Sequence, residues 1–248
     1  MGRFFVVGDI HGCPQELEDI ITACALERED RVVFLGDYID RGPGAREVVD
    51  FLLDLQADDV CTLTFLKGNH EDMFLDFLGH FGHFGESFLA NGGVATLKSY
   101  GIPQDMQERD AALHLPSQHL EFFQRLERYV AIEDTLCVHA GIDPLRSLAA
   151  QEEEAMFWIR QEFISHPHPL PYTVMFGHTP HREVLFDLPY KVGLDTGLVY
   201  GGKLSCLEVT EKKLLQVSKG VRRVQVTDVA PHWDRLVSLQ TRDLASGH

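Results

Sequence analysis

The sequence predicts an α/β fold in which two stacked sheets form one domain. Two observations support this prediction. Residues 4–66 alternate short apolar runs with amphipathic segments of helix length, which is typical of parallel strands joined by right-handed helical crossovers. From residue 174 onward, short apolar runs alternate with turn residues, which predicts a second sheet that is mostly antiparallel.

The parallel part is predicted from three strands and the helices between them. Residues 4–8, 32–35 and 60–66 have the length and composition of buried strands. Pro14 and Pro43 each stand where a helix can begin, because proline is tolerated in the first turn. Each helix then returns the chain to the same edge of the sheet for the next strand.

The rest of the chain is expected to add further helices and strands. Helices are predicted at residues 73–78, 94–99, 118–128 and about 151–164, and strands at 130–138, 173–176, 183–186, 191–194, 204–209, 213–217 and 222–226. Segment 79–93 has no clear period, so it stays open between a substrate-facing lid and a packed connector. No linker is found, so residues 1–248 are expected to be one domain, with a frayed tail at 241–248.

Composition narrows the classes of partner. The formal net charge of −16 argues against nucleic-acid binding, which depends on Lys and Arg, but leaves room for a small phosphate site. The five cysteines are odd in number and form no C-x-x-C pair, which favours reduced thiols in the cytoplasm. The N-terminus has no signal-peptide pattern, and no apolar run approaches the roughly 20 residues that span a bilayer.

Polar side chains with useful chemistry follow each of the first three strands. Gly8 to Gly12 follows the first strand, Gly36 to Gly42 the second, and Gly68 to Glu71 the third. Because the carboxyl ends of parallel strands meet at one edge of a sheet, these segments are expected to lie together. Glycines on both sides let the backbone turn sharply and approach a ligand.

Six of the residues at strand ends are candidate metal ligands: Asp9, His11, Asp37, Asn69, His139 and His178. Asp9 and His11 are two positions apart in extended chain, so both can face one ion. Asp37 could bridge two ions through its two carboxylate oxygens. A mixed set of nitrogen and oxygen ligands suits Mn, Fe or Zn better than Ca.

Each residue alone also has an ordinary explanation. An aspartate beside a glycine is usually a turn residue, and a histidine at a strand end could be a satisfied core group. The repetition of strand, glycine and polar residue at three consecutive strand ends favours a shared site instead.

These motifs resemble those of the PPP phosphoprotein phosphatases, which belong to the calcineurin-like metallophosphoesterases. Further segments resemble the compact prokaryotic and phage branch: Asn91-Gly92-Gly93, His139-Ala140-Gly141, Trp158-Ile159-Arg160, Gly177-His178-Thr179-Pro180 and Leu194-Asp195-Thr196-Gly197. The resemblance covers most of residues 4–207. It implies a β-sandwich of two mixed sheets flanked by helices, in four layers α/β/β/α.

The resemblance also implies roles for individual residues around two divalent metal ions. Asp9, His11 and Asp37 would bind the first ion, and Asp37, Asn69, His139 and His178 the second. His70 would be the general acid, Asp40 would orient it, and Arg41 and Arg160 would grip the phosphate. Manganese is the expected metal, with iron, zinc and nickel left open.

The expected activity is that of a serine/threonine protein phosphatase, with direct attack of a metal-bridging hydroxide on the phosphoester. Phosphotyrosine is left open as a further substrate. Asp40, Arg41, Gly42 and Glu71 favour this reading over its alternative, the symmetrical hydrolysis of diadenosine tetraphosphate. A catalytically silent scaffold is the third possibility. The expected partners are thus a phosphorylated protein or peptide, or a dinucleoside polyphosphate, with neither nucleic acid nor membrane.

Overall fold

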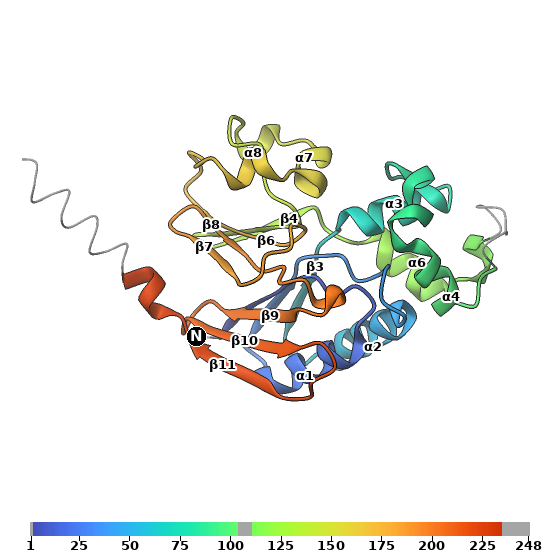
Figure 1. Cartoon of the computed structure of the whole chain (residues 1–248), viewed down its shortest axis with the longest axis horizontal. Coiled ribbons are helices and arrows are strands. Elements are labelled where there is room, and N and C mark those ends of the chain that lie inside the picture. The colour runs from blue at the N-terminus through green and yellow to red at the C-terminus, as the bar shows by residue number, and fades with distance from the viewer. Residues whose placement is uncertain (1, 104–110, 235–248) are drawn as a thin grey trace, which may run out of the picture.

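Two β-sheets stack face to face in the computed structural model, which describes residues 2–103 and 111–234 (Figure 1). The six-stranded sheet contains, in spatial order, β11 (Val224–Asp228), β10 (Lys213–Ser218), β9 (Lys203–Glu208), β1 (Phe4–Val7), β2 (Arg31–Phe34) and β3 (Thr62–Phe65). The five-stranded sheet contains β4 (Tyr129–Ile132), β5 (Thr135–Val138), β6 (Thr173–Phe176), β8 (Lys191–Gly193) and β7 (Leu185–Asp187). The predicted tail at 241–248 lies outside the described residues.

Strand β1 shows why the sheets stack. Its four residues are all buried, and successive side chains of a strand point to opposite faces. Phe4 and Val6 belong to the core between the two sheets, whereas Phe5 and Val7 belong to the core under the helices. A strand that is covered on both faces reads as a continuous apolar run, as this one does.

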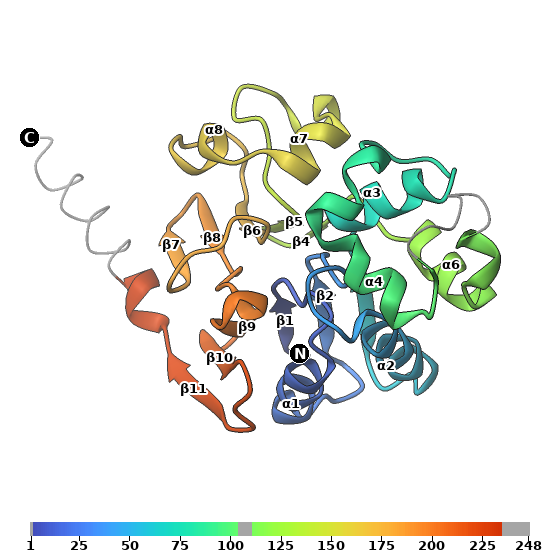
Figure 2. The same ribbon diagram turned by 45° about the vertical axis from the view of Figure 1, so that its right-hand side comes forward.

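Helices cover the outer face of each sheet. Helices α1 (Pro14–Cys24) and α2 (Ala45–Ala57) lie on the six-stranded sheet, and α7 (Glu153–Trp158) and α8 (Gln161–Ile164) lie on the five-stranded sheet (Figure 1). The four layers of the predicted fold class are therefore confirmed. Helices α3 (Asn69–Phe77), α4 (Val94–Ser99) and α6 (Ser117–Gln124) gather at one side of the sandwich (Figure 2).

The strands predicted from residue 174 onward do not form one antiparallel sheet, so that prediction was wrong. Strands β6, β7 and β8 lie in the five-stranded sheet, whereas β9, β10 and β11 lie in the six-stranded sheet. Strand β9 pairs antiparallel with β1, with Leu207 opposite Val6, and β10 and β11 continue the same sheet. Since β2 satisfies only one edge of β1, the other edge needs a partner for its backbone N–H and C=O groups. Strands β5, β6 and β8 instead pair in parallel, so both sheets are mixed.

Two long predicted elements are each interrupted. The strand predicted over 130–138 is a hairpin of β4 and β5, because Glu133 adopts a left-handed φ of 55° at a turn. The helix predicted over 151–164 breaks between α7 and α8, where Arg160 has φ −131° and ψ −100°. Helix α6 also ends before the predicted residue 128, since Glu127 pairs with the end of β3.

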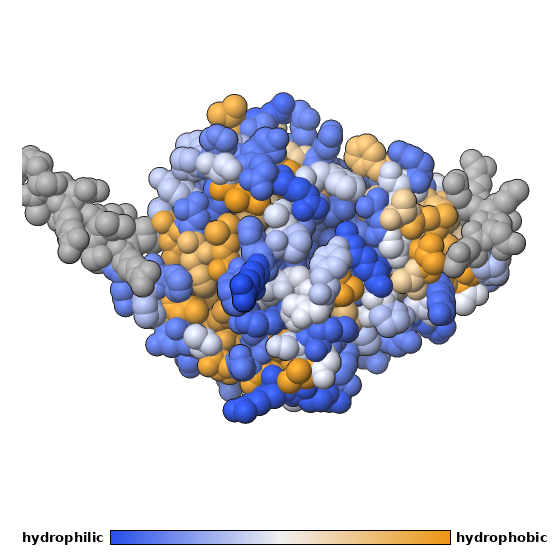
Figure 3. Space-filling view, viewed as in Figure 1, coloured by the Kyte–Doolittle hydropathy of each residue, from blue (hydrophilic) through white to orange (hydrophobic). Residues whose placement is uncertain are grey.

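The surface seen in Figure 3 is largely hydrophilic, as expected for an acidic chain, and the cysteines are unpaired, as their odd number suggested. Hydrophilic residues predominate across the middle of the face seen in Figure 3, and hydrophobic patches lie toward its two sides. All five cysteines are free thiols, and four of them are buried. Within residues 2–103 and 111–234, no helix has the length and apolar character required to cross a membrane.

Candidate metal centre

The loops after β1 and β2 are joined by backbone hydrogen bonds. The N–H groups of Ile10 and His11 both donate to the carbonyl oxygen of Asp37, at 3.1 and 2.8 Å. His11 and Asp37 adopt left-handed φ angles of 47° and 54°. Residues other than glycine seldom adopt this conformation, and such strain is common where side chains are held for function.

The third loop differs from the prediction because α3 begins at Asn69 rather than at residue 73. Glu71 explains this early start. Its carboxylate accepts the N–H groups of Gly68, Asp37 and Tyr38 at 3.0, 2.9 and 2.8 Å. A carboxylate at the third helical position satisfies free N–H groups and favours the positive end of the helix dipole. Asn69 and His70 therefore lie in the first helical turn, beside Asp37.

Asp37 lies between two groups of imidazoles. Its Oδ2 atom is 3.4 Å from His11 Nε2, and its Oδ1 atom is 3.4 Å from His139 Nε2. Two buried groups of potential metal ligands share this carboxylate, with all ligand atoms of a group within 4.8 Å of one another: His11, Asp37 and His70 in one, and Asp37, His139 and His178 in the other.

Asn69 and Asp9 lie at the same place. Asn69 Oδ1 is 2.9 Å from His178 Nδ1 and 3.1 Å from His139 Nε2. Asp9 Oδ2 accepts the backbone N–H of His178 at 2.9 Å. A Cβ atom at Gly177 would lie only 2.0 Å from Asp9 Oδ1, so a glycine is required for this approach. The structure thus brings together all six candidate ligands.

Unpartnered buried atoms show that these residues fit a bound cation. Asp9 Oδ1 and His178 Nε2 are buried and have no hydrogen-bond partner among the described residues. Leaving buried polar atoms unpaired is costly, and native proteins rarely do so without an ion or water. Carboxylate, amide and imidazole ligands in this number are suited to a first-row divalent metal.

The protonation states also fit metal binding. Burial lowers the pKa of His178 strongly and that of His11 to about 3, so both imidazoles are neutral and offer lone pairs. Although burial opposes ionisation, the surrounding imidazoles hold the pKa of the Asp37 carboxyl well below its usual range. Burial, together with the carboxylates of Asp195 and Asp37, raises the pKa of Asp9. A cation would relieve this accumulation of buried negative charge.

His70 is held by a buried carboxylate, which is in turn held by Thr96. His70 Nδ1 donates to Asp40 Oδ2 at 2.6 Å, while the hydroxyl of Thr96 donates to Asp40 Oδ1 at 2.6 Å. Burial lowers the pKa of His70, but the carboxylates of Asp37 and Asp40 outweigh it and raise that pKa above its ordinary value. The ring is therefore oriented and able to carry a proton toward Asp37, whose Oδ2 atom is 3.9 Å from Nε2.

The two predicted arginines occupy different positions. Arg41 Nη1 donates to His11 Nε2 at 2.5 Å, so this guanidinium lies at the centre. Arg160 has an exposed side chain and contributes mainly charge. Burial lowers the pKa of His139 and His178, and the charge of Arg160 lowers it further. The structure places Arg160 near the centre without a hydrogen bond to its ligands among the described residues.

Three residues at the centre were not given a role from sequence. Glu71 holds the Asp37 loop, Thr96 holds Asp40, and Asp195 is a third buried carboxylate whose pKa burial raises to about 6. Asp195 lies in the motif Leu194-Asp195-Thr196-Gly197, so the sequence did point to it. Thr96 lies in a short helix whose sequence carries no mark of this contact.

Segment 79–93 is a packed connector over its second half. Phe88 is fully buried against Phe74 and Phe77, and the carbonyl oxygen of Gly92 accepts the N–H of Arg41 at 3.1 Å. Phe84 remains partly exposed and packs against Trp158. Of the two alternatives left open, the connector describes residues 88–93.

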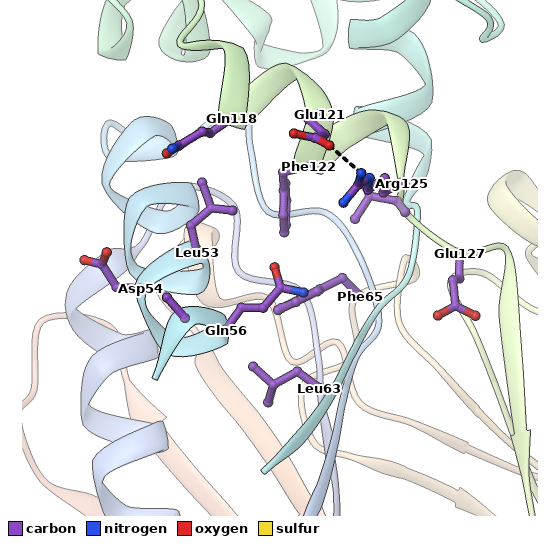
Figure 4. Close-up of a pocket in the computed structure, with 12 residues that line it drawn as sticks. Leu53, Asp54, Gln56, Leu63, Phe65, Gln118, Glu121, Phe122, Arg125 and Glu127 are labelled. Carbon is purple, nitrogen blue, oxygen red and sulfur yellow. Dashed lines mark ion pairs between the residues drawn. The ribbon is translucent and has the colours of Figure 1, made fainter. Parts of the chain in front are cut away.

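A hollow elsewhere on the molecule lacks comparable chemistry. It lies between α2, β3 and α6, and Leu63, Phe65 and Phe122 form an apolar part of its lining (Figure 4). Glu121 and Arg125 pair with each other on one side of it, at 2.5 Å. None of the candidate site residues lines it.

Comparison with known proteins decides the family. The profile of the calcineurin-like phosphoesterases matches residues 2–216, which is most of the chain. The chain belongs to this family. It is thus a metallophosphoesterase, and members of the family use a binuclear metal centre.

Individual relatives narrow the comparison. A bis(5'-nucleosyl)-tetraphosphatase PrpE (asymmetrical) from Bacillus mycoides is 25% identical over 87% of this chain and 94% of its own. The protein of the same name from Oceanobacillus iheyensis is 22% identical over 86% and 91%. A crystal structure provisionally described as a diadenosine tetraphosphatase is 25% identical, with a TM-score of 0.67 over 88% of this chain and 94% of its own.

The expectation of a serine/threonine protein phosphatase was therefore wrong. The relatives that span most of the chain carry the name of dinucleoside tetraphosphatases. A cold-active protein tyrosine phosphatase is only 17% identical, with a TM-score of 0.60 over 91% of this chain and 78% of its own, so it shows the fold alone. Glu71 had favoured a phosphatase, but its carboxylate is occupied by backbone N–H groups and so carries no information about substrate. The relatives' names specify asymmetrical cleavage, whereas the alternative expected from sequence was symmetrical cleavage.

Proposed function

We propose that this metallophosphoesterase hydrolyses dinucleoside polyphosphates such as diadenosine tetraphosphate, with asymmetrical cleavage to a nucleoside monophosphate and a nucleoside triphosphate. The names of the relatives over nearly their whole length support this substrate class. The acidic chain, with 38 Asp and Glu against 22 Lys and Arg, favours a small anion over a nucleic acid. The free thiols favour the cytoplasm as the location.

The observation that carries the proposal is the position of Asp37 between imidazoles on both of its carboxylate oxygens. We assign two divalent cations to this position, most simply manganese, with iron, zinc or nickel as alternatives. Asp9, His11 and Asp37 would hold the first cation, and Asp37, Asn69, His139 and His178 the second. Such a pair supplies a water nucleophile at neutral pH by lowering the pKa of water from 15.7 to about 7.

The remaining residues act on the phosphate and the leaving group. Arg41 at the centre offers a guanidinium that matches two phosphate oxygens, and Arg160 adds positive charge from the rim. His70, fixed by Asp40, donates a proton to the departing oxygen. Thr96 and Glu71 hold Asp40 and the Asp37 loop in place.

The experiment is a manganese-dependent assay of diadenosine tetraphosphate beside a phosphoserine peptide, with products separated by ion-exchange chromatography. We expect equal amounts of AMP and ATP, and no product after EDTA treatment. Turnover of the peptide alone would contradict the substrate class. ADP as sole product would contradict asymmetrical cleavage, and activity that survives the chelator would contradict the metal centre. Asp37→Asn serves as the inactive reference.

A further inference from the structure

Tyr200 is an exposed aromatic side chain beside the candidate metal centre. It is 65% exposed, and the guanidinium carbon of Arg41 lies 5.5 Å from the centroid of its ring. The same guanidinium donates to His11 Nε2. One arginine side chain therefore spans the interval between the centre and this ring.

The ring is held in place by a short, well-anchored turn. Tyr200 ends the 3₁₀ turn Leu198–Tyr200, in which Leu198 is buried in the core. The N–H of Tyr200 donates to the carbonyl oxygen of Gly197 at 3.0 Å. Most of the Tyr200 side chain is nevertheless exposed, so part of the ring is open to solvent. A rigid aromatic group with an open side loses little entropy when it binds a planar partner.

We infer that Tyr200 stacks on one nucleobase of the substrate, and that this places the phosphorus nearest to that nucleoside at the metal centre. The inference rests on the proposed function and names how it is achieved. One side of the ring meets the cation of Arg41, and the exposed part remains for a base. Stacking accepts any base, because every base has a π-face.

The short distance between the Tyr200 ring and the metal centre determines which phosphorus is attacked. Only a ribose separates a base from its own α-phosphate, whereas the β-phosphate lies one phosphate farther along. Because one guanidinium, that of Arg41, contacts both the Tyr200 ring and His11, the distance between ring and centre is short, and the α-phosphate is the group of matching reach. A base on Tyr200 thus accounts for asymmetrical rather than symmetrical cleavage.

The reaction that follows is balanced. The oxygen of a water molecule bonds to the α-phosphorus, and the bond from that phosphorus to the oxygen bridging to the β-phosphate breaks. The bridging oxygen leaves with the electron pair as part of the nucleoside triphosphate and takes a proton from His70. One oxygen atom and one hydrogen atom from water remain in the nucleoside monophosphate, and the other proton of the water returns His70 to its protonated form.

The first test compares two competitive inhibitors of diadenosine tetraphosphate hydrolysis, AMP and inorganic phosphate. In Tyr200→Leu, we expect the inhibition constant of AMP to rise about 5- to 150-fold, because a base–aromatic stack is lost. That of phosphate, which has no base, should change less than twofold. Tyr200→Phe, which keeps the ring, should bind AMP like the wild type. Tyr190→Leu is the control, since Tyr190 packs against His168 in the turn between β7 and β8.

The outcomes separate this inference from the proposed function. If the wild type hydrolyses diadenosine tetraphosphate but Tyr200→Leu binds AMP normally, base stacking is overturned and the proposed function stands. An equal rise in the inhibition constants of AMP and phosphate would also overturn base stacking, because it would indicate general damage to the centre. If the wild type does not hydrolyse the dinucleotide at all, the proposed function itself falls.

The second test identifies the attacked phosphorus directly. Hydrolysis is carried out in ¹⁸O-labelled water, and the products are analysed by mass spectrometry. We expect one labelled oxygen in AMP and none in ATP. Label in ATP would show attack at the β-phosphorus and would overturn the placement of the α-phosphate at the centre.

Discussion

At the scale of single residues, the centre depends on buried polar groups that hold one another. His70 Nδ1 is fixed by Asp40, while its Nε2 atom is buried and has no hydrogen-bond partner among the described residues. A donor that is oriented on one side and free on the other is what a general acid requires.

The role of His70 predicts a separation of catalysis from metal binding. His70→Asn should lower kcat by about 10²- to 10⁴-fold, which is the usual contribution of a positioned acid. Metal content, measured by plasma mass spectrometry after gel filtration, should stay at the wild-type value. Loss of metal on this substitution would instead make His70 a ligand, in line with its place in the group formed with His11 and Asp37.

Thr96 offers a finer test of positioning. Its hydroxyl donates to Asp40 Oδ1 and accepts the N–H of Asp40 at 2.9 Å. Thr96→Val removes both contacts at similar volume and should lower kcat about 5- to 150-fold, because an unsatisfied buried group costs about 1–3 kcal/mol. Thr96→Ser keeps the hydroxyl and should restore the rate and the pH profile. Equal kcat values for the two variants would exclude this role.

At the scale of elements, contacts at the ends of strands and helices hold these elements in place. Helix α8 is only four residues long, and a lysine from strand β8 caps its C-terminal end. Lys191 is fully buried, and its Nζ atom donates to the carbonyl oxygens of Phe163, Ile164 and His166 at 2.7, 3.1 and 2.6 Å. A cation at the C-terminal end of a helix satisfies free carbonyls and favours the helix dipole.

The substitution Lys191→Met should therefore destabilise the fold by about 2–4 kcal/mol, since three carbonyl oxygens lose the buried ammonium group that donates to them. For a chain of this size, the expected fall in Tm is about 4–16 °C. Lys213→Met is the matched control. Lys213 is a half-exposed lysine of β10 whose loss should change stability by less than about 0.5 kcal/mol. If calorimetry shows an equal fall in Tm for both variants, the capping role is refuted.

The elements also show what sequence could predict. The three parallel strands and the helices after Pro14 and Pro43 were predicted correctly, because apolar runs and proline act locally. The partner of β9 could not be predicted, since its pairing with β1 joins residues about 200 positions apart in sequence. The early start of α3 was missed for the same reason, because Glu71 holds a loop from another strand.

At the scale of the whole molecule, the candidate site is where the two sheets meet. Asp9, Asp37 and Asn69 come from the six-stranded sheet and the helix that follows it, while His139 and His178 follow β5 and β6 of the other sheet. Their convergence, which repetition of motifs predicted, is present in the structure. The contact of Thr96 with Asp40 was not predictable, because it arises only from packing, whereas Asp195 lies in a motif that the sequence offered.

This arrangement predicts that metal stabilises the fold. A cation that binds only the folded chain adds about 2.7 kcal/mol at one hundred times its dissociation constant, or about 5–10 °C in Tm. Manganese should therefore raise the Tm of the wild type. Asp37→Asn, which weakens both proposed positions, should lose most of the rise. If the Tm of the wild type does not change when manganese is added, a metal centre between the sheets is contradicted.

The most direct test of the central claim is anomalous diffraction at the manganese edge from crystals grown with Mn²⁺. The account predicts two peaks about 3.5–4 Å apart, one beside each carboxylate oxygen of Asp37. The first should lie against Asp9 and His11, and the second against Asn69, His139 and His178. A single peak, or peaks remote from Asp37, would contradict the account.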